Sequence, residues 1–266
     1  MNAASKIFLS IKPHQIINRF SLFLIVFVIL PFLFSCGISS KKKAEVSLDR
    51  NPPPPAIGQL FTYRHRGPCP GGDGQTDASG WRIVRVVDKP PQKDSLWMIE
   101  ERYEKDPGVY LSYCDDNYQL RRQIVKGTGR SVTMEFKPPQ DIRYSQLAPG
   151  AEKRYSYRLD YFVSDSKEKI GFASISDHVR RDYDVRIITK AGAYLCRQFH
   201  SDLAIETTMG GDSLYIRASV ESYWSDRIGW FVQQKYFFQP VTRDGEVVQP
   251  GYEAESILED FEPKTW

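Results

Sequence analysis

The residue types that most often carry out chemistry are few in this 266-residue chain, and they do not cluster along it. His65, His178 and His200 stand far apart, at spacings that match no compact metal-binding motif. The sequence also holds no Gly-x-Ser-x-Gly, phosphate-binding loop or His-Glu-x-x-His signature. Sequence alone therefore predicts no catalytic residue, no metal and no cofactor.

Two acidic segments resemble cation ligands only in part. Asp73–Asp77 has acids at its first and fifth positions, but Gln75 stands at the third and the closing glutamate of a calcium loop is missing. The run Asp115–Asn117 offers oxygen ligands, yet a polar turn between strands explains it without a cation. We expect no metal at either segment.

Cys36 is the residue for which the sequence most clearly predicts a chemical modification, because of the segment that precedes it. Three basic residues lead into the apolar run Leu22–Phe34, whose 13 residues are too few to span a bilayer comfortably. Ser35 is a small residue at the point of cleavage. The segment resembles the lipobox of a bacterial lipoprotein signal. It predicts a signal peptide over residues 1–35 and a lipid such as palmitate on Cys36, through which the chain would attach to a membrane. An uncleaved anchor helix is the alternative, and Pro31 argues against it because proline breaks helices.

Charge balance argues against a nucleic-acid partner. The formal net charge of +3 equals the three basic residues of positions 1–35, so the rest of the chain is neutral and has no excess for a basic face. Residues 36–56 would form a lipidated cysteine and a Lys- and Pro-rich tether. Within it, Lys41–Lys43 lies close enough to Cys36 to meet lipid head groups, or is a solvated linker. Pro52–Pro55 favours an extended polyproline conformation.

From Ile57 onward the chain predicts strands. Short stretches rich in aromatic and β-branched residues alternate with Gly, Pro and Asp. They cover residues 60–66, 81–88, 95–103, 109–113, 131–136, 155–163, 170–175, 183–189, 194–205, 214–223 and 230–238. Alternating polarity in several of them favours antiparallel sheet, and Gly210-Gly211 and Asp244-Gly245 favour tight hairpins. We expect one all-β domain over 57–266, as a curved antiparallel sheet, open barrel or sandwich. Ala254–Phe261 could be a last strand or a helix.

A weak internal sequence similarity suggests two related β halves. Pro107–Leu111 resembles Ala191–Leu195, and the proline-rich residues 137–150 between them form the best internal boundary, since proline cannot pair centrally in a sheet. Coincidence among residues that are common in strands would give the same similarity.

Four segments of the second half carry a family resemblance. They are Phe136–Pro139 running on to Leu147–Gly150, Ala191–Cys196, Tyr223–Ser225 and Ile228–Val232. Together they resemble the TapB-like and DUF3108-like families of exported bacterial β proteins, with departures at Lys190, Ala193-Tyr194 and Asp226-Arg227. The resemblance implies a curved antiparallel sheet akin to envelope half-barrels that handle lipids or lipoproteins, and it brings no catalytic residues.

After lipidation of Cys36, three cysteines would remain in an oxidising compartment, enough for at most one internal disulfide. We expect Cys69, in a Gly- and Pro-rich loop, to pair with Cys114 at the end of a strand. Closing that loop of about 46 residues would stabilise the fold by about 4 kcal/mol in the entropic model. Cys196, inside a strand, would then be a small buried hydrophobe. The alternatives are a bridge from Cys196 to either partner, or a free reactive thiol.

Aromatic residues are the remaining feature of the sequence that could indicate a binding function. Many tyrosines, tryptophans and phenylalanines either line a concave face that holds an apolar ligand or fill the sheet core. They are Tyr103, Tyr110, Tyr113, Tyr118, Tyr144, Tyr155, Tyr157, Tyr161, Trp224, Trp230, Tyr236, Phe237 and Phe238.

The sequence therefore predicts a non-catalytic cell-envelope lipoprotein whose β domain binds a lipid-like ligand or an envelope protein. Gly37, rather than an aspartate, follows Cys36, which favours the outer membrane facing the periplasm. A structural subunit would show a contiguous apolar patch on its outside. A hydrolase, the least favoured class, would bring His65 together with Asp115 or Asp116 in a pocket.

Overall fold

The computed structural model describes residues 55–68, 76–88, 96–127, 131–209 and 211–263. Residues 1–54, which hold the predicted signal peptide, Cys36 and most of the tether, lie outside the described residues. The described chain forms fifteen β-strands. They are β1 (Leu60–Arg66), β2 (Gly80–Asp88), β3 (Trp97–Tyr103), β4 (Asp106–Cys114), β5 (Gln119–Lys126), β6 (Val132–Asp141), β7 (Glu152–Val163), β8 (Lys169–Arg181), β9 (Val185–Thr189), β10 (Gly192–Met209), β11 (Asp212–Ser225), β12 (Trp230–Phe238), β13 (Val241–Arg243), β14 (Glu246–Gln249) and β15 (Tyr252–Glu262).

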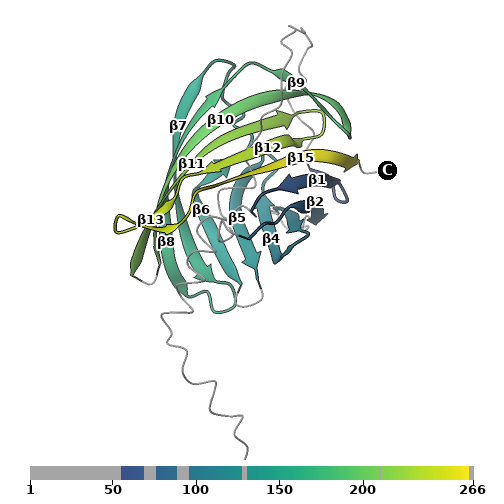
Figure 1. The fold of residues 1–266 in the computed structure, drawn as a ribbon. Coiled ribbons are helices and arrows are strands. Elements are labelled where there is room, and N and C mark those ends of the chain that lie inside the picture. Colours follow the sequence, from purple (N-terminus) through teal and green to yellow (C-terminus); the bar gives the residue numbers. More distant parts are fainter. Residues whose placement is uncertain (1–54, 69–75, 89–95, 128–130, 210, 264–266) are drawn as a thin grey trace, which may run out of the picture.

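The strands form one antiparallel sheet that closes on itself (Figure 1). Twelve of them make an up-and-down ring in which β15 pairs with β1 and every other neighbour is close in sequence. The all-β antiparallel prediction is confirmed, and the sheet is closed rather than open. Several strand pairs contain bulges, for example between Thr62 and Tyr63, and bulges bend and twist strands so that a sheet can close. The C-terminal segment is strand β15.

Three strands lie outside the ring. The β13–β14 hairpin pairs with β11 through Thr242 and Tyr215, while β9 pairs with the start of β10. The candidate boundary at residues 137–150 falls within the sheet, because β6 and β7 on either side of it pair with each other. The connection between them packs Ile142, Tyr144 and Leu147 into the same core as the rest of the ring.

The ring has two ends, which we name by the start of β1. The near end holds the beginning of β1 and, because neighbouring strands alternate in direction, the ends of β2, β4, β6 and β8. The far end holds the end of β1 and the β13–β14 hairpin. Among the described residues, no helix has the length and apolar character that crossing a membrane requires.

Side chains alternate between the ring interior and its outer face. On β2, Arg82, Val84 and Val86 are buried, whereas Trp81 and Ile83 are exposed. Most inward residues form one apolar cluster in which aromatic rings pack on one another, as Trp224 does on Tyr118, Trp230 and Phe231. A small second cluster holds Ala78, Tyr103 and Tyr110. Most of the aromatic residues singled out by sequence are buried there. In the described part of the chain they fill the core, and Phe237 is the one most open to solvent at 36% exposure.

Candidate functional site

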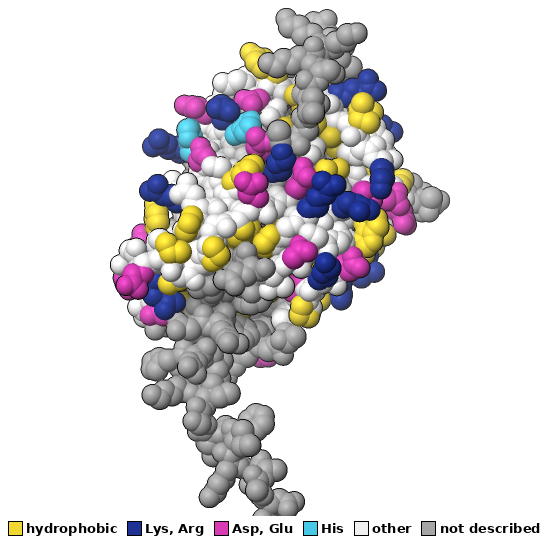
Figure 2. Space-filling view, in the orientation of Figure 1, with side chains coloured by type: hydrophobic (Ala, Val, Ile, Leu, Met, Phe, Trp, Pro, Cys, Tyr) yellow, Lys and Arg dark blue, Asp and Glu magenta, His cyan; other side chains and the backbone are white. Residues whose placement is uncertain are grey.

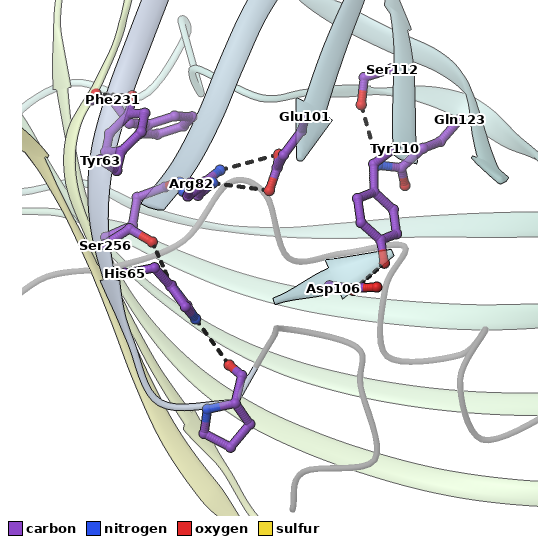
Figure 3. A network of polar contacts seen from close by, with 12 residues as sticks. Tyr63, His65, Arg82, Glu101, Asp106, Tyr110, Ser112, Gln123, Phe231 and Ser256 are labelled. Atoms are coloured by element: carbon purple, nitrogen blue, oxygen red, sulfur yellow. Dashed lines mark hydrogen bonds and ion pairs between the residues drawn. The ribbon is translucent and has the colours of Figure 1, made fainter. Parts of the chain in front are cut away.

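The first polar cluster lies inside the ring, where it is sealed from solvent (Figure 3). Arg82 is 0% exposed and donates two hydrogen bonds to the Glu101 carboxylate, with Nε–Oε1 at 2.9 Å and Nη2–Oε2 at 3.2 Å. Its Nη1 donates to Gln234 Oε1 at 2.6 Å, and its guanidinium lies 5.0 Å from the centre of the Tyr63 ring. A buried charge needs this complete pairing, so the cluster holds three strands together.

His65 extends this interior network. Its Nε2 lies 3.1 Å from the Pro68 carbonyl, which can only accept, so Nε2 carries the proton and Nδ1 accepts from the Ser256 hydroxyl at 3.0 Å. Burial lowers the pKa of His65 to about 4, with a further contribution from the nearby positive charge of Arg82. His65 is therefore neutral at pH 7, and both ring nitrogens are engaged within the protein.

A second buried cluster centres on Asp177 of β8. Its carboxylate accepts hydrogen bonds from the Ser201 hydroxyl and, at 2.8 Å, from the Tyr144 hydroxyl. Burial raises the pKa of Asp177 to about 6. His178, the next residue, cannot serve Ser201 as a base because successive strand residues face opposite sides of the sheet. The serine is thus bonded to a carboxylate without a histidine.

The structure does not bring the residues of the hydrolase hypothesis together. His65 lies toward the far end, whereas Asp115 and Asp116 follow β4 at the near end. Asp115 accepts from the backbone N–H groups of Asn117 and Gln119, which is the polar turn that sequence suggested. Asp116 accepts from the indole of Trp97 at 2.6 Å. Within the described ranges, no group of three or more His, Cys, Asp or Glu residues is arranged to hold a metal ion. Most of the segment Asp73–Asp77 lies outside them.

The cysteine pairing stays a prediction, because Cys69 lies outside the described residues. Cys114 and Cys196 are both buried free thiols, so they do not pair with each other. Burial raises the pKa of both thiols, which keeps them protonated. A bridge between Cys69 and Cys114 needs their Cα atoms within about 7 Å of each other. Peptide mapping without reductant would decide it.

Two hollows lie on the outer face of the described ring, over its longest strands. One groove of about 520 Å³ crosses β6, β7, β8, β10 and β11. It is lined by Lys137, Ser156, Tyr157, Arg158, Ser174, Ile175, Ser176, Ala204, Glu206 and Tyr215. Its floor is low because small residues meet in register, with Ser176 opposite both Ser156 and Ala204. Longer side chains one row further along, Arg158 and Glu206, form its walls.

A second hollow of about 230 Å³ continues along the same strands and carries the other two histidines. His200 Nε2 lies 2.9 Å from Asp182, and its Nδ1 lies 3.7 Å from Glu221. His178 Nε2 lies 3.5 Å from Glu152. Partial burial raises the pKa of Glu221, which the charge of His200 opposes. We call the two hollows together the outer groove. Figure 2 shows acidic, basic and histidine side chains interspersed on one face of the molecule.

Sequence reasoning missed the outer groove because its residues come from six strands, β6, β7, β8, β10, β11 and β12, and meet only through their register. The outward positions Ser174, Ser176 and His178 are spaced by two on β8, which was the available signal. Without the pairing partners on β7 and β10, that spacing indicates an exposed strand face and no more.

No family model matches the chain, so the resemblance to the TapB-like and DUF3108-like families is not shown. No curated protein matches either. Three solved structures are similar. One is a candidate exported protein with a YmcC-like fold from Bacteroides fragilis, at 12% identity and TM-score 0.38, covering 79% of this chain and 98% of that one. The second is a candidate lipoprotein from Parabacteroides distasonis, at 8% identity and TM-score 0.38, covering 79% and 97%. The third is the hypothetical lipoprotein YmcC from Escherichia coli, at 9% identity and TM-score 0.39, covering 79% and 86%. At such identities and TM-scores, the functional argument rests on this chain's own residues.

Proposed function

We propose that this chain is a lipid-anchored, non-catalytic binding protein of the bacterial cell envelope, which holds a protein partner in the outer groove. The anchor is Cys36, and Gly37 after it favours the outer membrane, with the β domain facing the periplasm. The observation that carries the binding role is the outer groove itself, which opens to solvent on the longest strands of the ring.

The lining of the outer groove favours a protein partner over a lipid-like ligand. Hydroxyl groups and charges of both signs surround it, among them Lys137, Arg158 and Glu206. An acyl chain placed there would strip water from these groups without returning hydrogen bonds, whereas a protein surface can pair them and gain specificity from charge complementarity. The ring interior, where an apolar ligand would otherwise fit, is packed with core side chains in the described residues.

The two other classes gain less support. A structural subunit would present a contiguous apolar patch, but the exposed large hydrophobic residues are spread over several strands, for instance Trp81 on β2 and Val247 on β14. A hydrolase would need an accessible base beside a nucleophile, and the described residues place Ser201 in a buried cluster without a histidine.

Crosslinking in intact cells tests the binding role. A photoactivated probe attached at Glu206→Cys, in the outer groove, should give one discrete protein adduct. The matched control is Arg102→Cys, which is also exposed and lies on the outside of β3, and it should give none. The same adduct from both positions, or none from either, would refute the site.

The anchor is tested separately. Mass analysis of the mature N-terminal peptide should show the lipid on Cys36, and Cys36→Ser should lose it. An unmodified Cys36 in the wild-type chain would refute the membrane assignment while leaving the groove experiment valid.

A further inference from the structure

The near end of the ring carries the most exposed apolar side chains of the described chain. Tyr183 is 77% exposed and Ile188 is 75% exposed, more than any other large hydrophobic residue there. Both belong to one short segment, in which Tyr183 precedes β9 and Ile188 lies within it. An exposed apolar edge strand is a liability in water unless something covers it.

This segment projects from the ring as part of a hairpin. β9 pairs only with the first residues of β10, so the hairpin stands beyond the twelve strands of the ring (Figure 1). Its tip is fixed to the ring by Lys190, whose Nζ lies 3.0 Å from Glu259 of β15. Ile188 is therefore presented on a held strand, and Tyr183 lies in the connection that immediately precedes it.

A cation accompanies the apolar residues. Arg186 and Ile188 share the outward face of β9, while Ile187 between them is buried in the core. Arg186 is exposed and has no ion pair with any residue of the described ranges. The neighbouring acids are already paired, Asp184 with Arg181 at 2.8 Å and Asp182 with His200 at 2.9 Å. An aromatic, an aliphatic and an unpaired basic side chain within six residues match the composition of segments that lie in a membrane interface.

The described chain also starts at this end. Pro55, 19 residues after Cys36, leads into β1 at the near end, and the Gly58 N–H bonds to the carbonyl of Val86, two residues before the end of β2. A tether of this length reaches about 60 Å when fully extended as polyproline. Its length therefore permits contact between the near end and the bilayer but does not require it. The far end carries Val247, 63% exposed on the edge strand β14, and lies at the opposite end of the ring from Pro55.

We infer that the near end rests on the membrane that anchors Cys36, with Tyr183 and Ile188 in the interface and Arg186 against anionic head groups. The inference depends on the proposed lipidation of Cys36. It places the ring end-on to the bilayer and leaves the outer groove, on the side of the ring, open to a partner.

Tryptophan quenching tests this contact in the full-length lipidated protein. Ile188→Trp and Val247→Trp each add one indole at a comparably exposed edge-strand position, and the five native tryptophans are a constant background. The proteins are reconstituted into vesicles of phosphatidylethanolamine and phosphatidylglycerol that contain brominated acyl chains. Relative to the unsubstituted protein, the added quenching should be at least about twofold larger for Ile188→Trp than for Val247→Trp. Arg186→Glu added to Ile188→Trp should reduce it, because it repels the anionic head groups.

Equal quenching at the two positions, in a protein whose Cys36 carries its lipid by mass, would overturn the inference and leave the proposed anchor intact. If the wild-type protein carries no lipid on Cys36 and does not associate with vesicles, the proposed anchor is overturned instead.

Discussion

Ion pairs occur both inside the ring and on its outer face, under opposite conditions of exposure. Inside, Arg82 and Glu101 form a pair that is almost wholly removed from water. Outside, His200 and Asp182 form a pair at the same 2.9 Å separation, with side chains 27% and 37% exposed. The interior pair is fully committed to the fold, while the outer pair can exchange protein contacts for contacts with a partner. Burial, more than the kind of contact, separates structural from available charges here.

The largest effect should come from breaking the interior pair. Arg82→Met leaves the Glu101 carboxylate buried without its counter-charge, and we expect a loss of about 3–5 kcal/mol in the free energy of unfolding. Urea denaturation followed by circular dichroism measures it. The double variant Arg82→Met with Glu101→Leu should recover most of the loss, because it removes both charges. A single variant as stable as the wild type would contradict the structural role of this pair.

The next effect concerns two interior groups with opposite pH dependence. Burial raises the pKa of Asp177 to about 6, so its stabilising contribution is complete below its usual pKa near 3.8 and disappears as pH rises through 6. Burial lowers the pKa of His65 from 6.5 to about 4, so its contribution is present above pH 6.5 and disappears as pH falls through 4. Each of these pKa shifts corresponds to a change of about 3 kcal/mol in the free energy of unfolding.

Between pH 4 and 6 the two contributions oppose each other, and the net change in stability from them should be small. Asp177→Asn should expose the His65 contribution, so that stability rises with pH by about 3 kcal/mol across this range. His65→Gln should expose the Asp177 contribution, with stability falling as pH rises. Unfolding midpoints measured at several pH values check both. The same pH profile in both variants would show that the two groups are not buried as described.

The smallest effect should come from the outer pair. His200→Ala should change the free energy of unfolding by less than about 1 kcal/mol, since exposed ion pairs are worth little to stability. The same substitution should reduce the crosslinked adduct formed from Glu206→Cys, because His200 lies in the adjoining part of the outer groove. A loss of stability as large as that of Arg82→Met would remove the distinction between the two faces.

The strands that the sequence fails to predict, or predicts too short, are those with polar side chains on their inward face. Strand β5 was not expected, because the fully buried Gln123 bonds to Ser112 inside the ring and interrupts the apolar alternation. Strand β8 was expected to end at residue 175 but continues to Arg181, past the inward Asp177. Alternation detects strands whose inner face is apolar, and these inner faces are partly polar.

Turn chemistry was more reliable than strand length. Asp244 and Gly245 both have positive φ angles, 51° and 86°, and join β13 to β14 as the predicted hairpin. Gly211, with a φ of 91°, lies between β10 and β11, where Met209 pairs with Asp212. Such turns depend on two adjacent residues and can be predicted locally. The outer groove depends on register between strands, which no local pattern contains.

Because β15 pairs with β1, the ring can close only once both of these strands are available. All other ring neighbours are close along the chain, whereas Leu60 meets Glu262 across nearly the whole domain. During synthesis β1 emerges first and its partner last, so one edge of the growing sheet has no strand to pair with until the final residues arrive. Long-range closure of this kind is slow, and until it occurs the incomplete ring exposes an unpaired strand edge that can pair with another chain.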